Sequence, residues 1–308
     1  MNDEAFQRLI KKQILECRWS DIAARWLSFL PAIDPPGSPP DVGVSDVIGF
    51  STVAATIREY DQTIKEEMPG LREYVFREGV YLLHKAFHVT GCAENGVKRG
   101  YKTWAINDAY QASLFGAKAI LCFCGIALAE LNSKAVLVDI WPKEHDTNKR
   151  RRQKLRLPAD PAIQFTRLNM KFEHRHVWAI FQRLLNVFDM GVWQDTYVRA
   201  LSRVEVRDFA KQRNDLHYKN YWWLFDDLHE FVIDPSFGVH ATNMEESLVY
   251  SSESDFSLCL SLAILRMAVL LFEDICGSTN ALNSEIRIIK DKLVIEQHPL
   301  YLTAYPET

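Results

Sequence analysis

The chain has 308 residues, of which 48% are hydrophobic and 25% charged, and its formal net charge is -4. This is the composition of an ordinary folded protein and excludes a disordered chain. The acidic balance also excludes binding to nucleic acid over the whole surface, so any such contact must come from a local basic patch.

Six cysteines are scattered along the chain without a C-x-x-C pair, and several lie in apolar runs such as Leu121-Cys122-Phe123-Cys124. Reduced thiols in such runs behave as small hydrophobic groups. We therefore expect a reducing, cytoplasmic setting without a zinc or disulfide framework, and no cofactor. The start of the chain lacks the pattern of a signal peptide, and its apolar stretches are too short to span a bilayer.

The first third of the chain is predicted to be largely helical. Apolar residues recur at helical spacing over residues 3 to 30, whereas Pro31 to Pro40 contains too many prolines for regular structure and predicts a loop or linker. Residues 51 to 88 favour helix again, with an interruption at Met68-Pro69-Gly70. Gly91 to Gly100 has the composition of a loop, but not the pattern of a phosphate-binding one.

The second part adds longer apolar segments. The length and the Ala, Leu and Ile content of Ala105 to Leu131 predict one buried helix, and the β-branched run Lys134 to Ile140 suits a lone strand. Phe172 to Met190 and Asp255 to Ile275 predict two further helices. The last of these is almost wholly apolar, so we expect it at the centre of a bundle.

Two histidine pairs suggest metal ligands, but a different reason argues against a metal site at each of them. His84 and His88 have the spacing of a zinc pair on one helical face, but the chain offers neither the intervening Glu nor an evident third ligand. In Glu173-His174-Arg175-His176 the two imidazoles diverge if the segment is helical, so a helix start explains it better. We therefore expect no metal.

Lys143 to Arg156 is a localised positive segment on an otherwise acidic chain. Two interpretations remain open: it grips an RNA backbone or an acidic partner, or it is a solvated loop. It contains no aromatic residue, so base stacking is not indicated. The candidate nucleic-acid contacts within it are Lys149, Arg150, Arg151, Arg152, Lys154 and Arg156.

The stretch Arg213-Asn214-Asp215-Leu216-His217-Tyr218 carries the strongest chemical signal. If the surrounding run, Val204 to Trp223, is helical, Arg213 and His217 project from one face. Arg forks onto phosphate oxygens and stabilises their growing charge, while His transfers protons near neutral pH. Such a pair suffices for RNA cleavage without a metal, although Arg and His four residues apart are also frequent by chance.

At these residues the chain resembles the HEPN superfamily, whose all-helical domains occur in many bacterial toxin, CRISPR and phage-defence ribonucleases. The Arg-Asn start and the aromatic after the His match the family's signature, but fewer residues than usual separate Arg213 from His217. The resemblance implies that His217 moves the proton of the ribose 2′-hydroxyl, Arg213 clamps the phosphate and Asn214 holds the geometry. Tyr218 is a further candidate contact with the RNA. A looser likeness to YaaC-like bacterial proteins, in length and helix order, points the same way.

These observations predict a mainly α-helical protein, with an N-terminal helical extension over residues 1–100 and a HEPN-like helical bundle over 101–308. The predicted function is a metal-independent endoribonuclease, a toxin or anti-phage defence effector acting at a dimer interface. Its partners would be RNA and either a second copy or a regulatory protein, with no membrane. The alternative is a noncatalytic HEPN-like helical subunit that binds protein or nucleic acid in a bacterial defence complex. A metal nuclease built on Asp226, Asp227 and His229 lacks the lysine and separated carboxylates of a known nuclease pattern.

Overall fold

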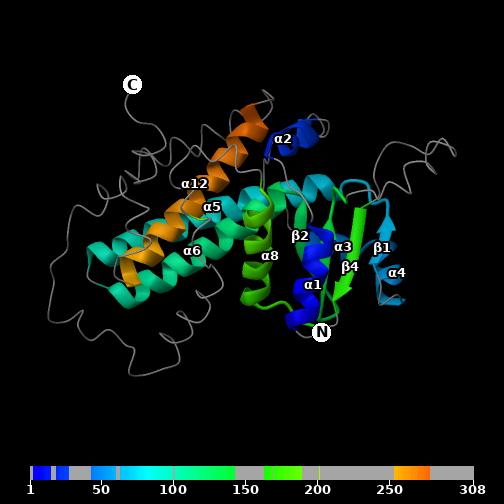
Figure 1. Ribbon diagram of the computed structural model, residues 1–308, viewed down its shortest axis with the longest axis horizontal. Coiled ribbons are helices and arrows are strands. Elements are labelled where there is room, and N and C mark those ends of the chain that lie inside the picture. The colour runs from blue at the N-terminus through cyan, green and yellow to red at the C-terminus, as the bar shows by residue number, and fades with distance from the viewer. Residues whose placement is uncertain are drawn as a thin grey trace.

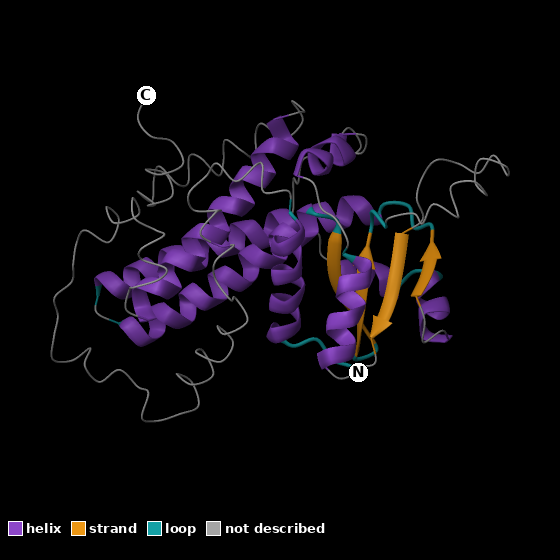
Figure 2. Cartoon of the chain, viewed as in Figure 1, coloured by secondary structure: helices purple, strands orange, loops and turns teal. Residues whose placement is uncertain are grey.

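The computed structural model describes residues 3–14, 19–27, 43–59, 63–99, 101–142, 163–168, 170–188, 201 and 253–277. Helices dominate this part of the chain, and a four-stranded antiparallel sheet accompanies them. The sheet lies toward one end of the molecule and the longest helices toward the other (Figure 2). The prediction of a mainly α-helical protein is therefore confirmed at this coarse level, but a sheet was not expected.

Three long helices pack side by side: α5 (Leu71–Lys98), α6 (Lys102–Phe123) and α12 (Glu253–Gly277) (Figure 1). One phenylalanine from each meets the other two where the helices come together. The ring centroids are 5.7 Å apart for Phe76 and Phe123, 5.6 Å for Phe123 and Phe272, and 6.2 Å for Phe76 and Phe272. The predicted apolar helix over Asp255 to Ile275 is confirmed and is buried along most of its length.

The predicted loop over Gly91 to Gly100 is wrong, because α5 continues through Lys98. One of the glycines that suggested a loop, Gly96, is instead a position where two helices pack closely. A β-carbon on Gly96 would lie 3.2 Å from the β-carbon of Ala105, so the missing side chain lets α6 approach α5 closely. The predicted interruption at Met68-Pro69-Gly70 is confirmed, since Gly70 adopts a φ of 82° just before α5 begins. The helix predicted over residues 51 to 88 is wrong at Thr63–Glu66, which form a strand.

The sheet has the strand order β1 (Thr63–Glu66), β4 (Ile163–Leu168), β3 (Lys134–Asp139), β2 (Ile126–Leu131), with every neighbouring pair antiparallel. Strands β2 and β3 form a hairpin whose two turn residues, Asn132 and Ser133, have φ values of 50° and 60°. Two-residue hairpin turns require such positive φ angles because their twist matches that of the strands.

Two predictions for this region are corrected. Ala105 to Leu131 is not one helix, because α6 ends at Phe123 and the chain turns at Gly125, where φ is 81°, before β2 begins. The predicted lone strand over Lys134 to Ile140 is β3, which pairs on both sides. Strand β2 is buried on most of both faces, so its sequence lacks the alternation that distinguishes a strand from a buried helix.

Shorter helices surround the sheet and the helical layer. Their bounds are α1 (Asp3–Gln13), α2 (Trp19–Leu27), α3 (Val44–Gly49), α4 (Val53–Glu59) and α8 (His174–Val187). Helix α3 covers edge strand β2, where Ser45 Oγ accepts the backbone N–H of Glu130 at 3.0 Å. Helix α1 contacts α8, and the Gln13 side-chain amide donates to Thr166 Oγ1 of β4 at 2.6 Å. The helices predicted near the N-terminus and over Phe172 to Met190 are confirmed.

A single large cluster of buried hydrophobic residues connects these elements. It includes Phe6 of α1 and Trp26 of α2 as well as Phe165 of β4 and Phe272 of α12, and so draws on residues before and after position 100. The described residues contain no helix long and apolar enough to cross a membrane.

Candidate functional site

The residues with the strongest sequence signal lie outside the described part of the chain. This is true of Arg213, Asn214, His217 and Tyr218, and also of the whole basic segment Lys143 to Arg156. Their geometry therefore remains a prediction. In the described residues, titratable side chains contact polar groups at the start of α8, at the corner after β3, and where α5 meets α3.

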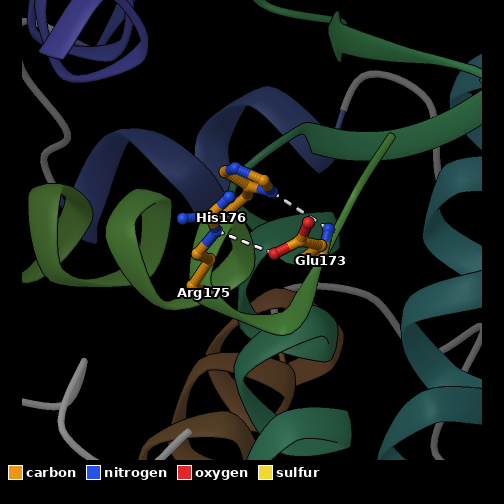
Figure 3. A network of polar contacts seen from close by, with 3 residues as sticks. All are labelled: Glu173, Arg175 and His176. Carbon is orange, nitrogen blue, oxygen red and sulfur yellow. Dashed lines mark hydrogen bonds and ion pairs between the residues drawn. The ribbon is translucent and has the colours of Figure 1, made fainter. Parts of the chain in front are cut away.

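The start of α8 carries two of the histidines, His174 and His176. Figure 3 shows His176 together with Glu173 and Arg175. The backbone N–H of Glu173 donates to His176 Nδ1 at 3.0 Å, and the backbone N–H of His176 donates to the Glu173 carbonyl at 3.0 Å. Arg175 Nε lies 2.8 Å from Glu173 Oε2, but both side chains are about half exposed, so this ion pair contributes only about 0–1 kcal/mol. The helix-start interpretation of Glu173-His174-Arg175-His176 is thus confirmed.

The two histidines face different helices, as their spacing predicted. His176 is buried with its ring edge-on to Phe6 of α1, at a centroid distance of 5.0 Å. His174 turns toward α6, where its Nδ1 lies 2.9 Å from the hydroxyl of Tyr110. That hydroxyl also accepts the indole N–H of Trp178 at 3.3 Å, and Tyr110 is only 2% exposed. The Tyr110, His174 and Trp178 side chains therefore form a polar contact between α6 and α8 that sequence spacing could not reveal.

No metal centre is found among the described residues, since they contain no group of three or more His, Cys, Asp or Glu side chains placed to hold an ion. His88, one of the pair with zinc-like spacing, is exposed on α5. Two imidazoles without a third ligand leave half of the four-coordinate sphere of Zn²⁺ unfilled.

A carboxylate of α5 lies at the beginning of α3. Glu78 Oε2 accepts the backbone N–H of Val44 at 3.0 Å. Burial raises the pKa of Glu78, and Asp46 adds to this effect, while the Val44 hydrogen bond and the charge of Lys118 oppose it. Burial, together with the nearby Glu78, raises the pKa of the Cys122 thiol well above its usual value. Cys122 therefore stays protonated at neutral pH and is not an activated nucleophile.

A carboxylate also lies at the corner after β3. Asp139 Oδ1 accepts the backbone N–H of Trp141 at 2.9 Å. Burial raises the pKa of Asp139 to about 6, although the Trp141 hydrogen bond and the charges of Arg25 and Lys65 oppose this increase. Arg72 lies over the Trp141 ring, with its guanidinium carbon 5.0 Å from the centroid. A carboxyl that titrates near pH 6 can change its charge under ordinary cellular conditions.

The described elements define a mainly helical class of protein in which three long helices share a core with a small antiparallel sheet. No family model, no curated protein and no solved structure matches the chain.

Proposed function

We propose that the chain is a metal-independent endoribonuclease of the HEPN type, acting as a toxin or anti-phage defence effector. The observation that carries this proposal is the Arg213-Asn214 pair followed by His217 and Tyr218 in one predicted helix. The predominance of helices in the described part is compatible with such a domain.

The chemistry follows from these residue types. His217 takes the proton of a ribose 2′-hydroxyl, whose oxygen then attacks the adjacent phosphorus. The bond from phosphorus to the 5′-oxygen of the next nucleotide breaks, and the released 5′-oxygen takes up a proton from water. Arg213 binds two oxygens of the same phosphate and stabilises the charge that grows on them. Asn214 holds the geometry. The product strand carries a 2′,3′-cyclic phosphate, because the attacking oxygen belongs to the substrate itself.

The first experiment measures cleavage of single-stranded RNA in the presence of a chelator. We expect the wild type to cleave, the His217→Ala variant to lose about 10²–10⁴-fold in rate, and Arg213→Lys to lose about 10²-fold because lysine keeps the charge but not the fork. His88→Ala is the matched control, because it removes an exposed imidazole of α5 and should leave the rate unchanged. Cyclic phosphate ends on the products would identify the 2′-hydroxyl as the nucleophile.

Two results would remove the proposal: no cleavage at any protein concentration, or full activity in the His217→Ala variant. Activity that disappears with the chelator would instead indicate a metal nuclease and direct attention to Asp226, Asp227 and His229. Because HEPN sites usually form where two copies of the motif meet, the rate per chain should also fall on dilution below the dissociation constant of the dimer.

The second candidate function is a noncatalytic helical subunit that binds another protein or a nucleic acid. Two large aromatic side chains at the beginning of α6 favour it: Tyr101 and Trp104 are 59% and 53% exposed. Aromatic residues are enriched where proteins bind one another. A chain that lacks ribonuclease activity but forms a stable complex, weakened by Trp104→Ala, would support this second function.

A further inference from the structure

Helices α5 and α6 are joined by a tight turn, the α5–α6 turn, at the end of the molecule far from the sheet (Figure 1). The backbone N–H of Arg99 donates to the carbonyls of Asn95 and Gly96 at 3.1 and 3.2 Å. The N–H of Tyr101 donates to the Gly96 carbonyl at 2.8 Å, and its own carbonyl accepts the N–H of Ala105 at 2.9 Å. Backbone hydrogen bonds therefore fix the path of the chain on both sides of this turn.

Two large aromatic side chains lie at this turn. Tyr101 and Trp104 are 59% and 53% exposed, and they are three residues apart, so they are neighbours at the start of α6. Position 104 lies about 120° around α6 from Gly116, the position that meets Ile264 of α12. Helix α12 therefore covers a different side of α6. Adjacent exposed apolar groups mark a binding surface, whereas single ones need no explanation.

The same turn is positively charged. Lys98 is the last residue of α5, Lys102 is the first of α6, and Arg99 between them is exposed. From Asn95 to Asn107 the sequence contains these three cations and no acidic residue, although the net charge of the chain is -4. The charge of the turn is thus opposite to that of the chain as a whole and complements a polyanion.

The combination of cations and rings identifies the kind of polyanion. Single-stranded nucleic acid offers phosphates to cations and unpaired flat bases to aromatic rings, whereas a duplex keeps the faces of its bases within the stack. An acidic protein would match the charge, but lysine is depleted in protein–protein interfaces, and two of the three cations here are lysines. The observations therefore favour a single strand.

We propose that the α5–α6 turn binds single-stranded nucleic acid, with bases stacked on Tyr101 and Trp104 and with phosphates beside Lys98, Arg99 and Lys102. Stacking accepts any base, so this binding is tolerant of sequence. The turn holds the strand and supplies no group for its cleavage. Binding is therefore independent of the proposed ribonuclease activity.

The test is the binding of a fluorescein-labelled oligodeoxythymidine of about 15 nucleotides to the full chain, followed by fluorescence anisotropy at low salt. This probe lacks the 2′-hydroxyl, so binding is measured without cleavage. We expect Trp104→Ala to weaken binding about 5–150-fold, because it removes one stacking surface. Phe50→Ala is the matched control, since it removes an aromatic side chain that is 85% exposed at the end of α3, and it should bind as the wild type does.

A double variant tests the contribution of charge. The logarithm of the affinity falls linearly with the logarithm of the salt concentration, and each phosphate contact of a single strand contributes about 0.7 to the slope. Arg99→Gln combined with Lys102→Gln should therefore reduce the slope by about 1.4. Lys11→Gln combined with Lys12→Gln removes the same charge from exposed positions of α1 and should leave the slope unchanged.

Three results would each overturn the proposal: no binding by the wild type at low salt, an unchanged affinity in Trp104→Ala, or an unchanged slope in the double variant of the turn. Polyglutamate distinguishes the remaining alternative, because it carries negative charge without bases. If it binds as tightly as the oligonucleotide and Trp104→Ala does not weaken it, the turn binds acidic partners in general and the proposal is wrong.

Discussion

Helices α6 and α12 approach closely at Gly116, and the substitution Gly116→Ala tests how much stability depends on that contact. A β-carbon on Gly116 would lie 2.8 Å from Ile264 Cγ2, whereas carbon atoms in good contact are about 3.5–4.0 Å apart. Ile264 is fully buried, and a β-branched residue in a helix has one strongly preferred rotamer. The side chain cannot swing away, so the two helices must separate by about 0.7–1.2 Å.

The expected cost is the difference between two effects. Overpacking a core in this way costs about 1–3 kcal/mol, while replacing a glycine within a helix by alanine returns about 0.5–1 kcal/mol. We therefore expect Gly116→Ala to reduce the free energy of unfolding by about 1 kcal/mol, the difference between the middle values of these two ranges. Urea unfolding followed by circular dichroism should show a lower midpoint at an unchanged m value.

Two further variants separate a steric clash from a general loss of stability. Ile264→Ala removes the opposing methyl group, so adding Gly116→Ala to that variant should fill space and raise its stability, reversing the sign of the effect. Gly49→Ala is the control without a clash, because a β-carbon there would lie at an ordinary 3.8 Å from Leu131 Cδ1, so it should show only the gain from alanine in a helix. The reasoning fails if Gly116→Ala is as stable as the wild type, or if it destabilises the Ile264→Ala variant equally.

Three other predictions concern single contacts and use the same urea assay. Gly125→Ala should cost about 2–4 kcal/mol, since it combines a positive φ with an overlap between the new β-carbon and Trp141; a loss below about 1 kcal/mol would contradict this. The raised pKa of Glu78 means that its ionisation opposes folding, so Glu78→Gln should gain stability over the wild type as the pH rises above 4.5, and a relative loss would contradict the sign. Tyr110→Phe should cost about 1–3 kcal/mol because it removes the hydroxyl that contacts His174 Nδ1; wild-type stability would show that this contact contributes nothing.

The sequence predicted helices where one face of a segment is polar or where a long apolar run is bounded on both sides. It therefore identified α1, α2, α8 and α12. It did not separate β2 from α6, because an apolar run that includes Ile126 to Leu131 gives no period of its own when both faces are covered. Glycines were also ambiguous, because a glycine can mark either a loop or a close approach of two helices. In Gly91 to Gly100 they suggested a loop, yet Gly96 is where α6 packs against α5.

The spacing of residues predicted correctly those features that depend on a single helix. The two-residue separation of His174 and His176 predicted that their side chains diverge on a helix, and they do so, toward Tyr110 of α6 and Phe6 of α1. The identity of those partners depends on how distant helices pack, which the spacing does not contain. The same holds for Arg213 and His217: their separation predicts one shared face if the run is helical, but only the packing around it decides whether they face a phosphate.

Asp139 shows why the remaining chemistry of the described part could not be predicted. In the sequence it is one carboxylate at the end of a β-branched run, with no charged neighbour that suggests a function. Its pKa is set by burial and by Arg25 and Lys65, which are brought to it by α2 and β1 from far earlier in the chain. The pKa of Asp139 therefore depends on how elements distant in the sequence pack around it, which residue spacing does not contain.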